Sequence, residues 1–146
     1  MTDTGVEFAS PAWMSAITDV LREAVKGLNT GGRSFVISEE FTNAPAHLTT
    51  SGQTSIGWHF SVTDDHVEVA PGAVDAGDLV TAVDYQACLP VARLIYADSP
   101  EAVEEATRIR ATARSTGSRI GDETALPPDL LARLVSVHNQ MARITR

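Results

Sequence analysis

Apolar and polar residues alternate in the central part of this 146-residue chain, over residues 56–63, where the apolar positions are Ile56, Trp58, Phe60 and Val62. A period of two residues is typical of a β-strand with one apolar face. Asp64 and Asp65 favour a turn, after which Val67 and Val69 resume the alternation. The pattern predicts a β-hairpin with one face against a core and a second face lined by Gly57, His59 and Ser61.

Two further segments alternate in the same way and flank this hairpin. They are SFVISEEF at residues 34–41 and DLVTAVD at residues 78–84. Consecutive strands joined by short connections usually pair antiparallel. With helices before and after them, these strands predict an α+β fold with a mostly antiparallel sheet and helices packed on one face.

Helical spacing of apolar residues follows the pair Ser10–Pro11, which suits an N-cap and a first helical turn. Asn29 to Gly32 predict the end of this helix. Residues 1–10 are expected to form a flexible leader. The stripe that predicts an amphipathic helix consists of Trp13, Ile17, Val20, Leu21, Ala24, Val25 and Leu28.

The chain after Tyr85 is dominated by helical patterns. YQACLPVARLIY predicts a buried helix, in which Pro90 begins a turn or produces a kink. Ser99-Pro100-Glu101 begins another helix, with Glu104 and Arg108 spaced for an ion pair. Pro127-Pro128-Asp129 introduces the last one, whose apolar side is Leu130, Leu131, Leu134, Val137, Met141 and Ile144.

Composition and charge limit the classes of protein to which this chain can belong. The net charge is −8, with 16 acidic and 4 basic residues up to Glu105, but 3 acidic and 7 basic residues after it. The acidic body argues against nucleic acid, and we expect the arginines of 108–119 and beyond to complement that body or a partner subunit. Apolar runs are too short to span a membrane, no secretory signal is apparent, and Cys88 is the sole cysteine. A cytoplasmic protein is the expectation.

One long stretch has a familiar order of elements. WHFSVTDDHVEVAPGAVDAGDLVTAVDYQACLPVARL contains a hairpin with an aromatic strand, a Gly/Asp-containing loop, and a strand that ends in Asp84–Tyr85 before a helix. In this order it resembles the core of the sterol carrier protein 2-like (SCP2-like) family, over roughly residues 11–97. The chain departs from the family after Ser99, where ATRIRATARSTGSRI reads as an arginine-rich helix in place of a short strand.

The resemblance implies a single domain over residues 11–146, with a divergent helical part from about residue 99, and helices that cover one sheet face around an apolar cavity. It also implies a binding or carrier protein for a hydrophobic small molecule such as a lipid, an acyl chain or a sterol-like compound. The family has no strict catalytic motif, so the resemblance supplies no catalytic residue. From periodicity, the expected cavity walls are Trp13, Ile17, Leu21, Phe35, Ile37, Trp58, Phe60, Leu89, Val91, Leu94, Val137 and His138.

The alternative is a small cofactor-independent enzyme, an isomerase, cyclase or lyase acting on an apolar substrate in the same cavity. Its candidate acid–base groups are His59, Asp84, Tyr85, Tyr96 and His138. Asp84 also suits an N-cap, and His138, beside the apolar stripe of the last helix, suits a group that bonds a backbone carbonyl. Two of these groups within hydrogen-bond reach at the end of one cavity would favour the enzyme.

His59 has three interpretations: a solvated outer face, a dimer face, or a ligand contact. Because Trp58 must face the helices, we expect His59 on the outward face, at a self-association surface of a homodimer. It would then lie near its symmetry mate, or near Glu39 or Glu40 of the other chain. The histidines are too scattered for a metal site, and no nucleotide-binding motif is present, so neither metal nor cofactor is expected.

Overall fold

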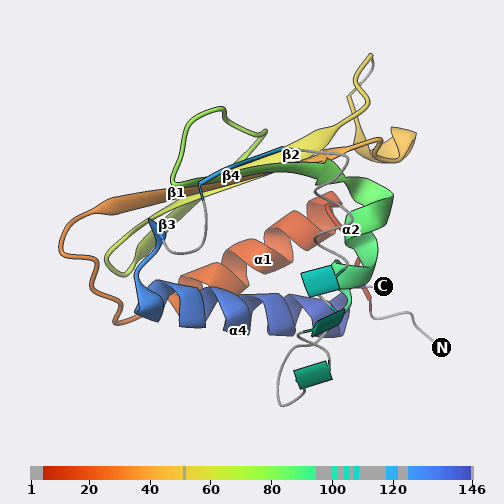
Figure 1. Ribbon diagram of the computed structural model, residues 1–146. Coiled ribbons are helices and arrows are strands. Elements are labelled where there is room, and N and C mark those ends of the chain that lie inside the picture. Colours follow the sequence, from red (N-terminus) through yellow and green to blue (C-terminus); the bar gives the residue numbers. More distant parts are fainter. Residues whose placement is uncertain are drawn as a thin grey trace.

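The structure is a computed structural model that describes residues 5–50, 52–94, 100–101, 104–105, 107–108, 118–121 and 125–145. It contains one sheet, and helices α1 (Pro11–Ala24) and α4 (Pro128–Ile144) pack together on one of its faces (Figure 1). The short helix α2 (Tyr85–Ala92) lies at one end of the sheet. The predicted α+β class, with helices on one face, is confirmed.

The sheet has the order β3-β2-β1-β4-β5. Its strands are β1 (Ser34–Thr42), β2 (Ile56–Thr63), β3 (His66–Pro71), β4 (Leu79–Asp84) and β5 (Ser118–Ile120). Three pairs are antiparallel, as predicted: β1 with β2, β2 with β3, and β4 with β5. The pair of β1 with β4 is parallel, because the chain between β3 and β4 crosses the sheet before β4 begins.

This crossing segment, residues 72–78, lies against the sheet face opposite the helices (Figure 1). The Val74 amide donates to Ser38 Oγ at 2.9 Å. The Val36 amide donates to Asp78 Oδ2 at 2.8 Å, and the Asp78 amide returns a bond to the Val36 carbonyl at 2.9 Å. These bonds pin the crossing segment to β1 and place β4 next to it. We call this face the outer face and the helix-covered face the inner face.

Helix α1 forms where the pattern predicts it. Ser10 Oγ accepts the Trp13 amide at 3.2 Å, and Pro11 occupies the first turn. The buried residues are Trp13, Ile17 and Leu21, spaced four apart on the side that faces the core. Arg133 of α4 donates to the carbonyls of Ala24 and Lys26, at 2.8 and 2.7 Å, so α4 satisfies acceptors at the end of α1.

Helix α4 confirms the last predicted stripe. Leu130, Val137 and Met141 are buried, and Leu131, Leu134 and Ile144 pack against the core while partly exposed. Asp129 occupies the first turn and Arg143 the last, and each charge suits the helix dipole at its end.

Residues 5–10 are docked on the rest of the chain, contrary to the expectation of a flexible leader. The Val6 amide donates to the Ile144 carbonyl at 2.7 Å, and Val6 bridges Thr145 in parallel. Phe8 is 3% exposed, and its ring lies 4.8 Å from that of Phe41 between centroids. The sequence-based expectation failed because two aromatic partners of Phe8, Phe41 and Tyr85, lie far away along the chain. Residues 1–4 lie outside the described part.

The prediction of a helix over the arginine-rich stretch is wrong at the end of that stretch. Residues 118–120 do not continue a helix: they form β5, which pairs with β4 through Val80↔Ile120. Residues 100–101, 104–105 and 107–108 are helical, as predicted from Ser99-Pro100-Glu101. Arg108 forms an ion pair with Glu105 rather than the predicted Glu104. The intervening residues 109–117 lie outside the described part.

Asp64, in the turn of the β2–β3 hairpin, ties that turn to the loop after α1. Its Oδ1 accepts the Thr30 amide at 2.8 Å, the Gly32 amide at 3.2 Å and the Thr30 hydroxyl at 3.1 Å. The Asp64 amide donates back to Thr30 Oγ1 at 2.8 Å. These bonds, led by the one from the Thr30 amide, lower the pKa of Asp64 below 3.8.

Replacement of Asp64 by Asn is expected to lower the free energy of unfolding at neutral pH, because a neutral amide accepts these bonds less strongly than a carboxylate. Since the folded-state pKa of Asp64 is depressed, its contribution is complete above the unfolded value near 3.8 and is lost as pH falls through the folded value. The difference between wild type and Asp64→Asn should therefore shrink below about pH 4.

Urea unfolding of both proteins between neutral pH and about pH 2 measures this difference. The control is Asp65→Asn, which removes a charge from the same turn at a residue that accepts none of these bonds. Its free energy of unfolding should stay close to that of wild type at pH 7. A difference for Asp64→Asn that is constant over the whole pH range would contradict the assignment.

Candidate functional site

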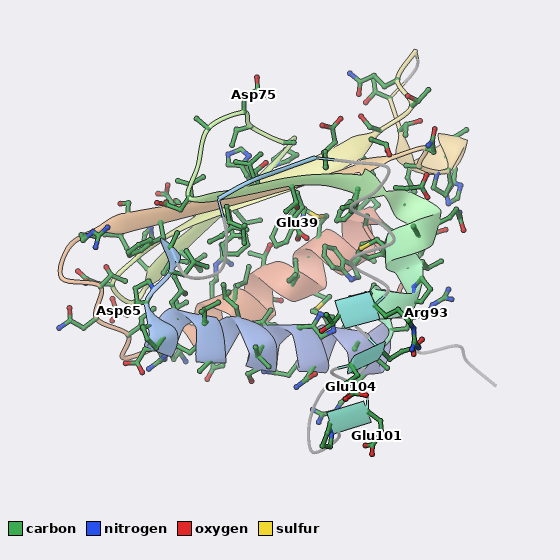
Figure 2. The ribbon with its side chains drawn as sticks, viewed as in Figure 1. Glu39, Asp65, Asp75, Arg93, Glu101 and Glu104 are labelled. Carbon is green, nitrogen blue, oxygen red and sulfur yellow. The ribbon has the colours of Figure 1, made fainter. Side chains whose placement is uncertain are left out.

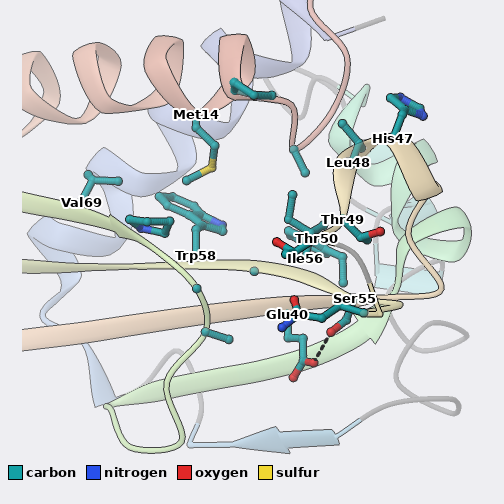
Figure 3. A pocket seen from close by; sticks show the side chains of 18 of the residues that line it. Met14, Glu40, His47, Leu48, Thr49, Thr50, Ser55, Ile56, Trp58 and Val69 are labelled. Atoms are coloured by element: carbon teal, nitrogen blue, oxygen red, sulfur yellow. Dashed lines mark hydrogen bonds between the residues drawn. The ribbon is translucent and has the colours of Figure 1, made fainter.

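A groove of about 840 Å³ opens between the first half of α1, the β2–β3 edge and the connection from β1 to β2 (Figure 3). This connection includes the 3-10 helix η1 (Ala46–Leu48), and a bond of 2.9 Å from the Ala44 amide to the Thr54 carbonyl closes it at its base. The volume lies in the range of small-molecule sites, about 300–1,000 Å³. We call this site the α1–β2 groove.

The inner side of the groove is apolar. Met14 projects from α1 toward Trp58, with Val69 on one side of them and Ile56 on the other, and Leu48 lies farther along the groove beside His47 (Figure 3). The Trp58 ring stacks on Phe60 at 5.0 Å between centroids, and the Trp13 ring meets it edge-on at 5.6 Å. These aromatic neighbours hold the buried Trp58 ring in one orientation as a rigid support beneath Met14, Ile56 and Val69, the half-buried apolar floor of the groove.

The indole N–H of Trp58 is already bonded. It donates to Glu39 Oε1 at 3.0 Å. Glu39 pairs with Trp58 across β1 and β2, so both side chains lie on the inner face. Figure 2 shows Glu39 between the sheet and α1. Trp58 is 2% exposed, so it lies beneath the half-buried side chains of the groove, and its polar atom is occupied by the protein.

The other end of the groove is polar and lies on the outer face. Glu40 pairs with Gly57, one residue out of phase with Phe41↔Ile56, so its side chain points away from the apolar floor. Figure 3 shows Glu40 and Ser55 on the far side of β2 from Met14, joined by a bond from Ser55 Oγ to Glu40 Oε2 of 2.8 Å. Asp75 of the crossing segment lines the same end.

His47 closes the groove at η1. Its Nε2 lies 2.8 and 2.9 Å from the two carboxylate oxygens of Glu7. This contact ties η1 to the N-terminal segment, next to Ala9 and Pro11, which also line the groove. The half-buried Leu48 is the last residue of η1. The position of η1, and so of one groove wall, depends on the docked N-terminal segment.

The structure places His59 on the outer face, as predicted. Its Nδ1 lies 2.7 Å from the Gly72 carbonyl of the crossing segment, so the protein's own chain supplies its partner. Gly57, on the same face, has the crossing segment directly above it: a Cβ there would lie 2.9 Å from Ala73 Cβ. Self-association through this face stays a prediction, but Glu39 is ruled out as its partner because it faces inward.

Asp84 and Tyr85 have structural roles at the start of α2. Asp84 caps the helix, as predicted: its Oδ1 accepts the Ala87 amide at 3.0 Å and its Oδ2 accepts from Asn43 Nδ2 at 2.9 Å. The bond from Asn43 and then that from Ala87 lower its pKa. Tyr85 is buried and donates to the Phe8 carbonyl at 2.7 Å. Burial, with the charge of Glu7, raises its pKa.

His138 lies on the inner edge of α4. Its Nε2 is 2.8 Å from the Leu94 carbonyl, the kind of backbone partner anticipated for it. Tyr96 lies outside the described residues. Among the four described candidates for acid–base chemistry, no hydrogen bond joins one to another, and none of the four lines the α1–β2 groove.

The residues predicted to form the cavity walls fall into two groups by exposure. Trp13, Ile17, Leu21, Phe35, Ile37, Trp58, Phe60, Val91 and Val137 are buried, and Leu89, Leu94 and His138 are half-buried. Of all these, Trp58 is the one that also lines the α1–β2 groove formed by described residues. Ligand contact by the others stays a prediction.

Sequence reasoning missed most of the groove. Met14 lies one position beside the buried stripe of α1, and Leu48 is an apolar residue within a polar loop. An isolated apolar residue in a loop was the available signal. It carries little information alone, because which surface such a loop covers depends on the tertiary structure.

The described residues contain no group of three or more His, Cys, Asp or Glu side chains placed to hold a metal ion. None of their helices is long and apolar enough to cross a membrane.

Fold and groove together define a small α+β domain with helices on one sheet face and an amphipathic groove at the sheet edge. No protein-family model and no curated protein sequence matches the chain. Solved structures do match. The crystal structure of sterol carrier protein 2 is 12% identical, with 94% of this chain and 96% of that chain covered and a TM-score of 0.48.

Two other matches are of the same kind. The ubiquinone synthesis protein UbiJ-SCP2 is 13% identical, with 90% of this chain and 89% of that chain covered and a TM-score of 0.44. A conserved hypothetical protein from Thermus thermophilus, described as possibly a sterol carrier protein, is 12% identical, with 95% and 92% covered and a TM-score of 0.48. All three structures share little sequence identity with this chain, and the function proposed for it rests on the α1–β2 groove.

Proposed function

We propose that this protein is a binding or carrier protein for a hydrophobic small molecule, which it holds in the α1–β2 groove. The observation that carries the proposal is the amphipathic lining of the groove: a half-buried apolar floor of Met14, Ile56 and Val69 over Trp58, with polar groups from α1, from the β1–β2 connection and at the outer-face end. Small-molecule sites likewise combine apolar surface with polar groups that orient the ligand. A lipid, an acyl chain or a sterol-like compound has the matching character.

The enzyme alternative has less support. It requires two acid–base groups that meet at one cavity, whereas His59, Asp84, Tyr85 and His138 each bond to a different structural partner. We therefore favour binding over catalysis.

Binding is tested with protein purified without detergent. We expect native mass spectrometry to detect a co-purified ligand, or titration with fatty acids, acyl thioesters and sterols to give a saturable change in tryptophan fluorescence, since Trp58 lies directly beneath the floor of the groove. If no ligand co-purifies and no class of ligand changes the fluorescence, the result counts against the proposal.

A pair of variants tests the location of the site. Ser15 is exposed on α1 and lines the groove, so Ser15→Phe should fill part of the groove and weaken binding about tenfold or more. Ala12 is exposed on the same helix but does not line the groove, so Ala12→Phe should bind like wild type. Equal affinities for the two variants would place the ligand elsewhere.

A further inference from the structure

The charged groups of the α1–β2 groove are of one sign, apart from a histidine. Its lining contains the carboxylates of Glu40 and Asp75 and no lysine or arginine from the described residues. His47 is the basic group of the lining, and its Nε2 faces both carboxylate oxygens of Glu7. An anionic head group entering this groove would meet two carboxylates and no free ammonium or guanidinium group of the described lining.

The carboxylates and the apolar floor lie at opposite ends of the groove. Trp58 and Ile56 face inward, whereas Glu40 faces outward at the pair Glu40↔Gly57. Ala73 of the crossing segment fills the space above Gly57, but Ile56, Ser55 and Glu40 line the same groove on either side of the β2 edge. A ligand with its tail on Met14 and Ile56 can therefore extend past the edge of β2 at Ser55 and bring its head to Glu40.

Glu40 is placed to act on such a head group. Its side chain is half-buried, which reduces screening by solvent, and Ser55 fixes one of its oxygens with a hydrogen bond of 2.8 Å. A carboxylate accepts several hydrogen bonds at once, so the bond to Ser55 leaves acceptor capacity for a donor from the ligand. Asp75, on the crossing segment above the outer face (Figure 2), adds a second negative charge at this end.

We propose that the α1–β2 groove selects amphiphiles with a cationic head group, an alkylammonium at Glu40 with its tail on Met14 and Ile56, and discriminates against carboxylates of the same chain length. This inference rests on the proposed binding function and specifies its ligand class. An ammonium group donates charge-assisted hydrogen bonds to Glu40, whereas a carboxylate head is repelled by Glu40 and Asp75. A neutral alcohol should lie between them in affinity.

The test compares three probes with one tail: decylamine, decanol and decanoate, each below its micellar concentration at neutral pH and low salt. Calorimetry and tryptophan fluorescence measure the affinities. We expect the order decylammonium, decanol, decanoate, with about tenfold or more between the first and the last. Added salt should weaken binding of decylammonium and leave decanol unchanged.

Glu40→Gln should reduce the affinity for decylammonium about tenfold and leave that for decanol unchanged. The matched control is Glu68→Gln, which removes the same charge from exposed β3 outside the groove and should have little effect. The control separates a local contact from the overall negative charge of the protein.

The outcomes separate this inference from the proposed function. If all three probes bind equally, or if Glu40→Gln leaves the order unchanged, the head-group inference is overturned while binding in the groove stands. If none of the probes binds and no ligand co-purifies, both the head-group inference and the proposed binding function are overturned.

Discussion

Phe8→Ala is expected to destabilise the protein by about 3–5 kcal/mol, the range observed for truncation of a buried phenylalanine. Phe8 is 3% exposed, and its ring contacts those of Trp13, Phe41 and Tyr85 at centroid distances of 5.2, 4.8 and 5.2 Å. The truncation would leave a cavity among rings from α1, β1 and α2, which cannot collapse without moving several elements. Urea unfolding measures the change.

The control for Phe8 is its neighbour Glu7. Glu7→Ala removes the contact with His47, which lies near the surface, and should cost about 1 kcal/mol or less. Should Phe8→Ala fail to fold, Phe8→Leu, which keeps an apolar side chain, provides a measurable intermediate. If Phe8→Ala were as stable as Glu7→Ala, the N-terminal segment would be a leader after all, and the docking seen here would be wrong.

Gly57→Val is expected to destabilise the protein by about 1–3 kcal/mol, the usual consequence of forcing extra atoms into a packed site. A Cβ at Gly57 would lie 2.9 Å from Ala73 Cβ, 2.9 Å from the Glu39 carbonyl oxygen and 3.0 Å from the Ala73 amide nitrogen. Two of these atoms are backbone, one in β1 and one in the crossing segment, so the crossing segment would have to lift away and the pairing of β1 with β2 would have to shift. Chemical denaturation measures the change, and Gly57→Ala should give a smaller effect.

Ser61→Val is the matched control, because Ser61 lies on the same strand and the same outer face, four residues further along. A β-branched residue suits a strand at such a position, so Ser61→Val should stay within about 0.5 kcal/mol of wild type. Equal effects of the two substitutions would show that the crossing segment does not press on Gly57 in solution.

The crossing segment also bears on how the outer face is used. It engages His59 through the Gly72 carbonyl and Ser38 through the Val74 amide, so two polar groups that face away from the helices are satisfied within the chain. A homodimer through this face would have to form around the segment. Residues of the same segment, Gly72, Ala73 and Asp75, line the α1–β2 groove, so the outer face and the groove share a wall.

Several features of this protein are determined by the sequence alone, because they depend on local periodicity. Spacing of four residues marks Trp13, Ile17 and Leu21 as the buried side of α1, and alternation places Trp58 inward and His59 outward on β2. Asp84 before a helix is a cap for the same local reason. Such patterns state which side of an element is apolar and where the element begins.

Other features were decided by the tertiary structure, because local periodicity does not state which distant segment covers an apolar side. Phe8 is buried by rings from Trp13, Phe41 and Tyr85, and Gly57 is required by Ala73 of a segment that crosses the sheet. That crossing also makes the pair of β1 with β4 parallel. The α1–β2 groove exists because α1, η1 and the β2–β3 edge meet in space, and no local pattern in any one of them specifies that meeting.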